Sequence, residues 1–383
     1  MLRAPVIPVV QFLFSAAVTL AVGCAPERIA LPAPGSAHLV FVGDAVLPRI
    51  APEGGARADV GGISGAFYDA RTRQIVAVSD DRTRPRLLLF DLRVATPVQV
   101  KTAATIALQP PHTERRTFDL EGIASARGGR VFVSSEGDAA DPNQPAPGIY
   151  EYTRDGRFVR SLPLPRTYLG DGQASGMRGN GALEALSISP DGSRLFAAAE
   201  SSLRQDGPEA SFDDGATIRV LAYDLGAAPL RPREYAYRVE ALERPPDFQR
   251  ARGDTGVSEI VALSATELLF LERGFVRETI TSGTGRTSNT IRIFRAALAD
   301  DAEVTGRESL AGRSPGAVLK KELVLDVGSI ASQLSPPLRA LENFEAMAIG
   351  PRLKDGRATL LLMSDDNFNV HQVTALVVLA FHR

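Results

Sequence analysis

The stretch that decides the fold runs from Leu183 to Glu200 and reads LEALSISPDGSRLFAAAE. Two short apolar segments flank Asp191-Gly192, a dipeptide typical of a tight β-hairpin turn. One acid opens the first segment at Glu184, and another follows the second at Glu200. The start of one antiparallel strand and the end of its neighbour share one edge of a sheet, so we expect both acids at one rim.

The same pattern occurs five times along the chain of 383 residues. The first members of the pairs lie at Ser64, Glu121, Glu184, Glu259 and Glu345. The second members lie at Asp80-Asp81, Glu136, Glu200, Glu272 and Asp365-Asp366. Successive first members are 57, 63, 75 and 86 residues apart, a periodicity that indicates a propeller whose loops lengthen along the chain.

Around these pairs the sequence predicts an all-β fold, a β-propeller of five four-stranded blades. The inner and second strands are predicted at 65–68 and 74–78, 121–125 and 130–134, 184–189 and 194–199, 259–263 and 267–271, and 345–349 and 359–363. The outer strands are predicted at 86–90 and 105–108, 148–152 and 158–162, 218–223 and 234–239, and 290–294 and 322–325. The last unit has only one more strand, at 375–381, so we expect His38 to Val42 to complete it and close the ring, which hides two sheet edges. Six blades are the alternative, if Leu164 to Gly179 or Arg244 to Thr255 pair as strands.

Closure of the ring would bring nine carboxylates to one mouth, where like charges need cations or hydrogen-bond donors to stay ionised. Ca²⁺ prefers such a set of oxygen ligands, and the expected ligands are Asp80, Asp81, Glu136, Glu200, Glu259, Asp365 and Asp366. The expected catalytic acids are Asp80, Glu121, Glu184, Glu345 and Asp365. Arginine binds phosphate and carboxylate in a bidentate manner, so the expected substrate-binding residues are Arg82, Arg204 and Arg273, together with Asn367. The open alternative is that the acids lock the blades by accepting main-chain N–H groups, or pair with the arginines.

The N-terminus predicts export. Residues 1–24 read as a signal peptide, because Arg3 precedes an uncharged apolar stretch that ends at Cys24. The run Leu20-Ala21-Val22-Gly23 before that cysteine resembles a lipobox, so we expect lipidation of Cys24 and a periplasmic or cell-surface lipoprotein. A simple secretory cleavage near Ala25 is the alternative. Residues 25–37 read as a flexible tether and residues 38–383 as the propeller domain.

Composition and missing motifs exclude several classes of function. The net charge of -2 implies no nucleic-acid partner and no membrane contact other than a lipid anchor. The chain contains no G-x-S-x-G and no HExxH motif, and its four histidines are scattered, which disfavours a serine hydrolase and a zinc site. We expect a monomer that binds a small anionic substrate.

Several of these segments resemble the bacterial phytase-like family, which is described as having esterase-like activity of phytase. The matching segments are residues 62–65 with 79–82, 119–123 with 134–136, 183–186 with 189–192, and 343–346 with 364–367. The resemblance covers about Gly61 to His382 and implies an exported propeller with phosphoesterase or esterase activity. The calcium motif of the six-bladed β-propeller phytases cannot be laid over this chain residue by residue, so the resemblance does not by itself imply phytate as substrate.

The leading hypothesis is therefore a Ca²⁺-dependent hydrolase of a phosphoric ester. Its bound metal would lower the pKa of a water molecule while Arg82 and Arg273 orient the ester. The rival hypothesis is a non-catalytic propeller that binds a protein or glycan and uses calcium structurally.

Overall fold

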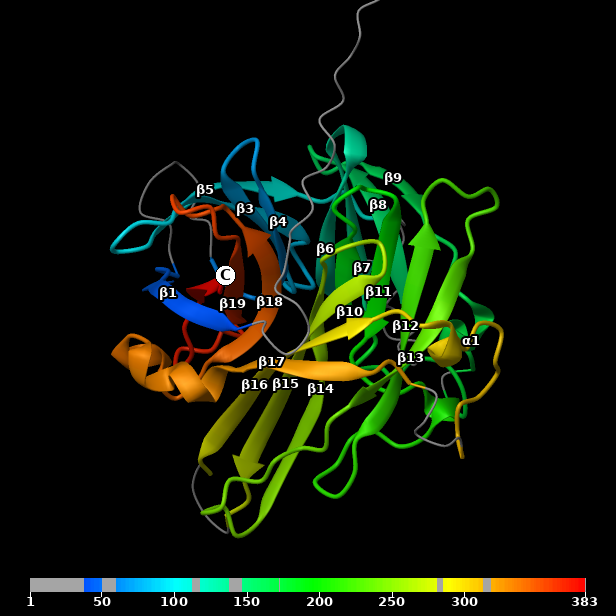
Figure 1. Cartoon of the computed structure of the whole chain (residues 1–383). Helices are drawn as coiled ribbons and strands as arrows, with labels where there is room; N and C mark the ends of the chain where they lie inside the picture. The colour runs from blue at the N-terminus through cyan, green and yellow to red at the C-terminus, as the bar shows by residue number, and fades with distance from the viewer. Residues whose placement is uncertain are drawn as a thin grey trace, which may run out of the picture.

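The computed structural model describes residues 38–49, 60–111, 118–137, 147–171, 173–280, 285–312 and 318–382. The predicted signal peptide, Cys24 and the tether lie outside these residues. The described strands form five antiparallel sheets of four strands each, arranged as the blades of a propeller (Figure 1). The predicted five-bladed all-β fold is confirmed.

Each of the first four blades uses four strands that are consecutive in the sequence. The first two blades comprise β2 (Ile63–Asp69), β3 (Gln74–Ser79), β4 (Arg86–Arg93) and β5 (Gln99–Ala107), then β6 (Leu120–Ala126), β7 (Arg130–Ser135), β8 (Gly148–Thr153) and β9 (Phe158–Ser161). The next two comprise β10 (Leu183–Ile188), β11 (Arg194–Ala199), β12 (Ala216–Asp224) and β13 (Pro232–Val239), then β14 (Ala251–Ala262), β15 (Glu267–Glu278), β16 (Thr287–Ala297) and β17 (Lys321–Asp326).

The fifth blade joins the two ends of the described chain. It comprises β18 (Asn343–Gly350), β19 (Thr359–Asp365), β20 (Ala375–Phe381) and β1 (Leu39–Val46), in that order from the inside outward. Leu39 pairs with Phe381 and Val46 pairs with Ala375. The inner strand β18 in turn contacts β2 of the first blade, which closes the ring as predicted.

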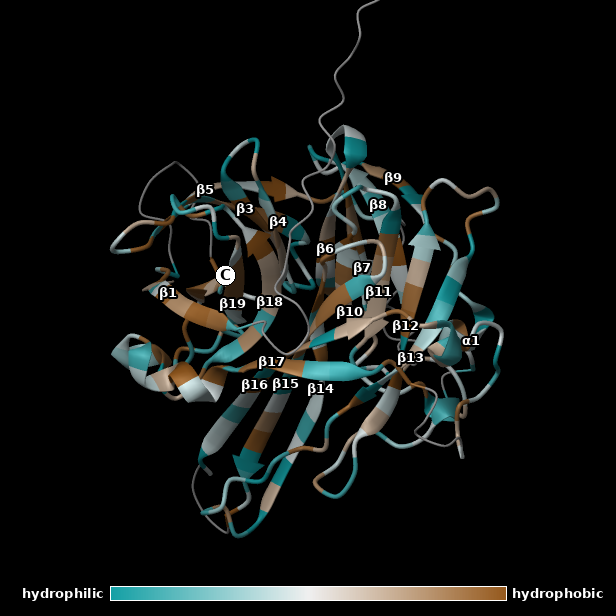
Figure 2. Cartoon of the chain, in the orientation of Figure 1, coloured by the Kyte–Doolittle hydropathy of each residue, from teal (hydrophilic) through white to brown (hydrophobic). Residues whose placement is uncertain are grey.

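The hydrophobic core consists of five main clusters, and each lies between two neighbouring blades. Along β19, Leu360 and Leu362 pack toward the fourth blade, whereas Leu361 and Met363 pack toward the first. Successive side chains of a strand point to opposite faces, so a strand that is buried on both faces reads as an unbroken apolar run. The hydrophobic residues, brown in Figure 2, accordingly lie mainly on the strands, and the loops are largely teal.

The segments proposed for a sixth blade take other roles. The first, residues 164–179, contains the short helix α1 (Arg166–Leu169). The second, residues 244–255, ends in the first residues of β14, which begins at Ala251 instead of the predicted Glu259. Strands β14 and β15 are 12 residues each. They extend beyond the point where the first strand begins and the second strand ends in the other blades.

Candidate functional site: an acidic cavity at one end of the ring

A cavity of about 460 Å³ lies at the end of the ring where the inner strands begin and the second strands end. Nine carboxylates line it: Asp80, Asp119, Glu121, Glu136, Glu184, Glu200, Asp254, Glu345 and Asp365. Three arginines line it as well, Arg82, Arg273 and Arg277, together with Ser64, Asn180, Phe275, Asn343, Asn367, Asn369 and Gln372. The predicted crowding of acids at one mouth is thus present, with a membership that differs in part from the sequence prediction.

A β-bulge recurs in every inner strand, at its start in four blades and within the longer β14, between Val257 and Glu259, in the fourth. In the third blade Leu183 pairs with Ala199 while Ala185 pairs with Ala198, which leaves Glu184 outside the ladder. The residues in this first unpaired position are Ser64, Glu121, Glu184, Ser258 and Glu345. Bulges increase the local twist and redirect a side chain. Four of these five side chains line the cavity, and the exception is Ser258.

The register also defines a second ring position, on the second strand of each blade. It is the residue directly after the one that pairs with the inner strand just ahead of the bulge, as Asp80 follows Ser79, the partner of Ile63. The residues in this position are Asp80, Glu136, Glu200, Arg273 and Asp365, and all five line the cavity. In the fourth blade the two positions are therefore held by Ser258 and Arg273. The prediction from the internal repeat assigned Glu259 and Glu272 to these positions, because each of these acids is one residue away from the position that the register gives.

Glu259 lies below the cavity, at the ring position that follows the bulge. The residues that follow the first unpaired position in the other blades are Gly65, Gly122, Ala185 and Ala346, all of them small. The Glu259 carboxylate is 1% exposed and its Oε1 accepts N–H groups of Leu186 at 3.2 Å and Ile260 at 3.0 Å. Glu259 does not line the cavity, and its contacts are those of a carboxylate that links neighbouring blades.

Glu272 is also outside the cavity. Its carboxylate accepts from the Tyr237 hydroxyl at 2.7 Å, from Lys321 Nζ at 2.6 Å and from the Glu240 N–H at 3.0 Å. These contacts lie between the third and fourth blades and satisfy the buried acid fully. Glu272 is therefore a structural residue of that blade interface.

Of each Asp-Asp pair, one member faces the cavity and the other holds a loop. Asp81 lies 2.7 Å from Arg84 and 2.8 Å from Arg86, outside the cavity. Asp366 pairs with Arg49 at 3.0 Å and accepts the Gly62 N–H at 3.2 Å. Gly62 has a φ of 63°, and a side chain there would collide with Asp80 and Phe368. The loop that Asp366 fixes carries Asn367, which does line the cavity.

The predicted arginines behave differently from one another. Arg82 forms an ion pair with Asp119, and Arg273 lies 2.8 Å from Glu200, 3.4 Å from Glu345 and 3.6 Å from Asp254. Arg204 lies in a 3-10 turn and does not line the cavity. Arg273 is thus a cation built into the ring of acids.

The sequence reasoning missed Asp119 and Asp254. Asp119 lies two residues before Glu121, a spacing that places both side chains on the same face of an extended chain, and this was an available signal. Asp254 faces the cavity only because β14 and β15 continue beyond the other blades, with Asp254 paired to Phe275. No local pattern in the sequence marks that extension.

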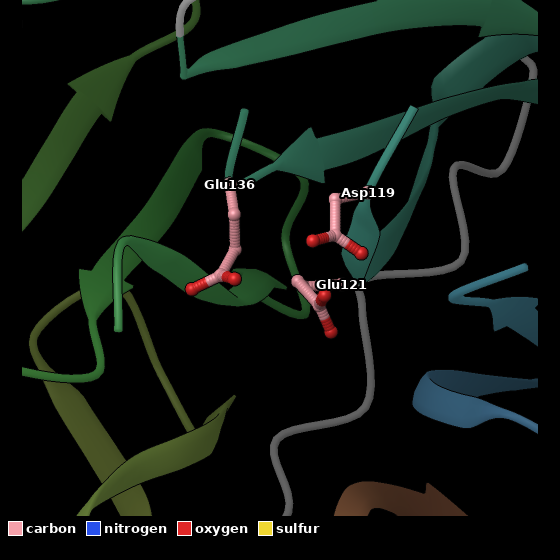
Figure 3. Close-up of side chains that lie close together, drawn as sticks. All are labelled: Asp119, Glu121 and Glu136. Atoms are coloured by element: carbon pink, nitrogen blue, oxygen red, sulfur yellow. The ribbon is translucent and has the colours of Figure 1, made fainter. Parts of the chain in front are cut away.

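Three acids of the second blade form the tightest group. One carboxylate oxygen from each of Asp119, Glu121 and Glu136 lies within 4.8 Å of the other two, and Figure 3 shows the three side chains directed into a common space. Glu136 Oε1 is held by the N–H groups of Gly181 and Ala182, both at 2.7 Å. Near this group, the cavity-lining Ser64 Oγ and Asp80 Oδ1 are buried without a hydrogen-bond partner. An all-oxygen set with unsatisfied buried oxygens fits a hard cation such as Ca²⁺.

Burial changes the acidity of these groups. Burial, reinforced by neighbouring carboxylates, raises the pKa of Glu121, Glu184 and Asp365 well above ordinary values. Burial also raises the pKa of Asp80 to about 7, and of Glu200 to about 7 even though Arg273 opposes the rise. Without a bound cation, the ring therefore holds protons at pH values at which exposed carboxyl groups have lost them.

The profile of the phytase-like family, described as "esterase-like activity of phytase", matches residues 58–368. The chain belongs to this family. The match spans the first four blades and the strands β18 and β19 of the fifth, and it includes all nine carboxylates and all three arginines of the cavity. Of the residues that line the cavity, only Asn369 and Gln372 lie outside it. The resemblance noted on the bulge segments is confirmed.

Other comparisons are more distant. An uncharacterized secreted protein from Arthroderma benhamiae is 26% identical over 246 residues, which cover 56% of this phytase-like chain and 45% of the relative. The chain thus spans less than half of that relative's length. An aldose sugar dehydrogenase from Streptomyces coelicolor in its PQQ-bound form is 11% identical over 92% of this chain and 100% of its own, with a TM-score of 0.34. An exo-1,5-α-L-arabinanase from a bovine ruminal metagenomic library is 8% identical over 84% and 97%, with a TM-score of 0.39.

The described residues contain no helix with the length and apolar character needed to cross a membrane.

Proposed function

We propose that this phytase-like chain is an exported hydrolase that cleaves a phosphoric ester of a small anionic substrate, with Ca²⁺ as its cofactor. The observation that carries the proposal is the single cavity lined by nine carboxylates and three arginines. Acids alone would repel an anionic ester. Acids that hold a cation, next to arginines, attract one.

Asp119, Glu121 and Glu136 would hold the cation, because their oxygens already lie within 4.8 Å of one another. A bound Ca²⁺ would neutralise charge on the phosphoryl oxygens and lower the pKa of a bound water. Arg273 faces the same cavity from the fourth blade, and its guanidinium, held by Glu200, is positioned to orient an anionic group.

Asp80 is the candidate for proton transfer. Its Oδ1 is buried without a hydrogen-bond partner, its side chain lines the cavity, and its pKa of about 7 allows it to hold or release a proton near neutral pH. A group with such a pKa is suited to protonating a leaving oxygen in one step and to taking up a proton in another.

Export is part of the proposal, supported by the apolar N-terminal segment and by the secreted relative. The strand β1 begins at Leu39, opposite Phe381, at the end of the ring away from the cavity. An acyl anchor on Cys24 would therefore join the propeller at the end opposite to the acidic mouth.

The test is hydrolysis of 4-nitrophenyl phosphate and a panel of other phosphate esters by the purified protein. We expect turnover that a chelator abolishes and that added Ca²⁺ restores. A rise in melting temperature with Ca²⁺ and no turnover of any ester would overturn the catalytic proposal and favour a binding module with structural calcium.

A further inference from the structure

The extension of β14 and β15 forms a wall above the acidic ring. Strand side chains alternate between faces, so Arg273, Phe275 and Arg277 share one face of β15, and Phe275 and Arg277 line the cavity above Arg273. From Arg273 to Arg277 a strand rises by about 13 Å. An open recess of about 350 Å³ adjoins the cavity here, lined by Arg252, Gly253, Asp254, Phe275 and Arg277.

The opposite face of this wall is covered by a small hydrophobic cluster. There Val276 contacts Leu242 and Phe248, with Phe212 partly buried beside them. The wall is therefore held in place by its own small core, and the face toward the cavity is free to bind a ligand.

Two cations on the wall lack an acidic partner. Arg252 and Arg277 are directly opposite each other in the β14–β15 register, and both are exposed. Like charges in directly opposed positions destabilise an antiparallel pair. Among the described residues, neither guanidinium forms an ion pair, whereas Arg273 on the same face contacts three acids. A pair of unneutralised guanidinium groups is a site for an anion.

An aromatic ring, that of Phe275, lies between Arg277 and Arg273 along β15, directly opposite Asp254 in the register. Phe275 is half-buried, and the Arg277 guanidinium lies 5.8 Å from its ring centroid. An aromatic face bordered by guanidinium groups favours a planar ligand group that carries negative charge.

We propose that this wall is a leaving-group subsite. It would take an ester whose leaving group contains a planar ring, stacked on Phe275, with a second anionic substituent that reaches Arg277 and Arg252. The inference rests on the proposed function for the reacting end of the substrate, which lies in the acidic ring. It adds the class of ester, an aryl or heteroaryl ester with a distal anionic group.

The chain contains no tryptophan, so Phe275→Trp creates a single fluorescent reporter in the subsite. We expect 4-nitrobenzylphosphonate, which cannot be hydrolysed and whose nitroaryl ring quenches tryptophan, to give saturable quenching in the presence of Ca²⁺. Methylphosphonate, which has no ring, should bind at least tenfold more weakly in competition. The matched control is Phe212→Trp, a half-buried phenylalanine with Arg244 over its ring on the packed face of the same wall, which should show no saturable quenching.

A second variant tests the distal anion. In the Phe275→Trp background, 4-carboxybenzylphosphonate should displace the nitro ligand, and Arg277→Gln should weaken that displacement at least fivefold while changing the affinity of the nitro ligand less than twofold. Absence of saturable quenching, or equal competition by methylphosphonate, would overturn the subsite. These experiments measure binding, so they test the subsite even if the protein hydrolyses no ester. The proposed hydrolase activity is tested separately, by turnover.

Discussion

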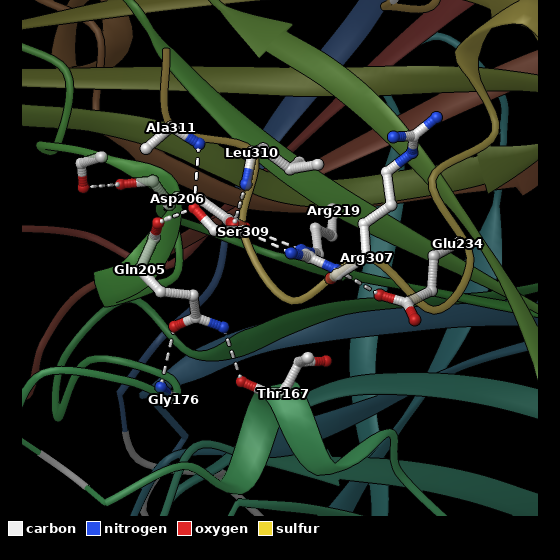
Figure 4. A network of polar contacts seen from close by, with 12 residues as sticks. Thr167, Gly176, Gln205, Asp206, Arg219, Glu234, Arg307, Ser309, Leu310 and Ala311 are labelled. Atoms are coloured by element: carbon white, nitrogen blue, oxygen red, sulfur yellow. Dashed lines mark hydrogen bonds and ion pairs between the residues drawn. The ribbon is translucent and has the colours of Figure 1, made fainter. Parts of the chain in front are cut away.

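Two buried groups of charges in this molecule differ in how completely they are paired. Figure 4 shows the first, in the third blade, where the fully buried Arg219 donates to Asp206 at 2.7 and 2.8 Å and to Glu234 at 2.9 Å. Arg219 also donates to the Arg307 carbonyl at 2.8 Å, and Asp206 accepts the Leu310 N–H at 2.9 Å. Every charge in this group has partners within the protein, and the group fastens a loop of the fourth blade to the third.

The second group is the acidic cavity, where carboxylates outnumber arginines three to one. Ser64 Oγ and Asp80 Oδ1 have no partner there, and the pKa values of its acids are raised by burial and mutual repulsion. Buried charges that are paired and hydrogen-bonded serve structure, whereas buried charges left incomplete indicate a site for a ligand. The contrast distinguishes a structural cluster from a functional one within the same fold.

The largest effect on stability is expected from breaking the fully paired group around Arg219. Arg219→Met leaves Asp206 and Glu234 buried without their cation, so the free energy of unfolding should fall by about 3–5 kcal/mol. Denaturant unfolding measures this. Arg233→Met is the matched control, because Arg233 pairs with Asp300 and Glu303 at the surface and should lose no more than about 1 kcal/mol. Equal losses for the two variants would contradict the structural role of the Arg219 group.

Removing one acid from the acidic cavity should not lower the stability of the ion-free protein. Glu121→Gln should lower kcat for a phosphate ester by about 100-fold and weaken Ca²⁺ binding, while the stability of the ion-free protein stays equal or rises, because one source of repulsion is gone. Kinetics, calcium titration and unfolding measure the three quantities.

The control for Glu121→Gln is Glu272→Gln, because the sequence placed both acids in one ring. Glu272→Gln should leave the Ca²⁺ affinity unchanged and should cost about 1–3 kcal/mol of stability, since Lys321 loses its buried partner. If both variants weaken calcium binding alike, the assignment of the ring positions from the bulges is wrong.

The pH dependence of stability should reveal the excess of carboxylates over cations in the cavity. Asp80 and Glu200 hold their protons up to a pKa of about 7 in the folded protein but lose them at ordinary carboxyl pKa values when unfolded. The folded state then binds more protons, so the ion-free protein should lose stability as the pH rises from about 4 to 7. Calcium competes with these protons, so a fixed calcium concentration of 100 times the Kd measured at pH 8 should add about 2.7 kcal/mol of stability at pH 8 and much less at pH 5, where the Kd is higher. Melting curves at several pH values, with chelator or Ca²⁺, check this, and an unchanged ion-free melting temperature would contradict it.

The smallest effect is expected for Ser64→Ala. The Ser64 hydroxyl is buried without a partner in the cavity wall, so its removal should change stability by less than about 1 kcal/mol. If the hydroxyl contributes to the cation site, calcium affinity should still fall by about two- to fivefold. Isothermal titration measures this, and Ser258→Ala, at the equivalent bulge outside the cavity, is the control.

Local features of the sequence account for the correct predictions. The hairpin from Glu184 to Glu200 is a short-range structure, with its turn fixed by Asp191-Gly192, so its two acids fall at one rim as predicted. The same reasoning correctly placed Glu121, Glu136 and Glu345 in the cavity. Repetition of one local pattern also gave the number of blades and the terminal strand that closes the ring.

Where prediction departed from the structure, the deciding contacts are long-range. Which of Glu259 and Ser258 is bulged depends on the pairing of β14 with β15, and a slip of one residue exchanges the two faces of a strand. Asp80 and Asp81 are neighbours in the chain, yet only Asp80 faces the cavity, because successive side chains of an extended segment point in opposite directions.

By itself the sequence determined the repeat, the turns and the presence of an acid near each strand end, because these depend on residues close together in the chain. The tertiary structure alone decided that Arg273 takes a place in the ring, that Asp254 reaches it on an extended strand, and that Glu259 is buried outside the cavity, where it accepts a main-chain N–H group of the third blade. Those outcomes depend on register and on the approach of different blades, and blades distant in sequence meet only when the ring closes.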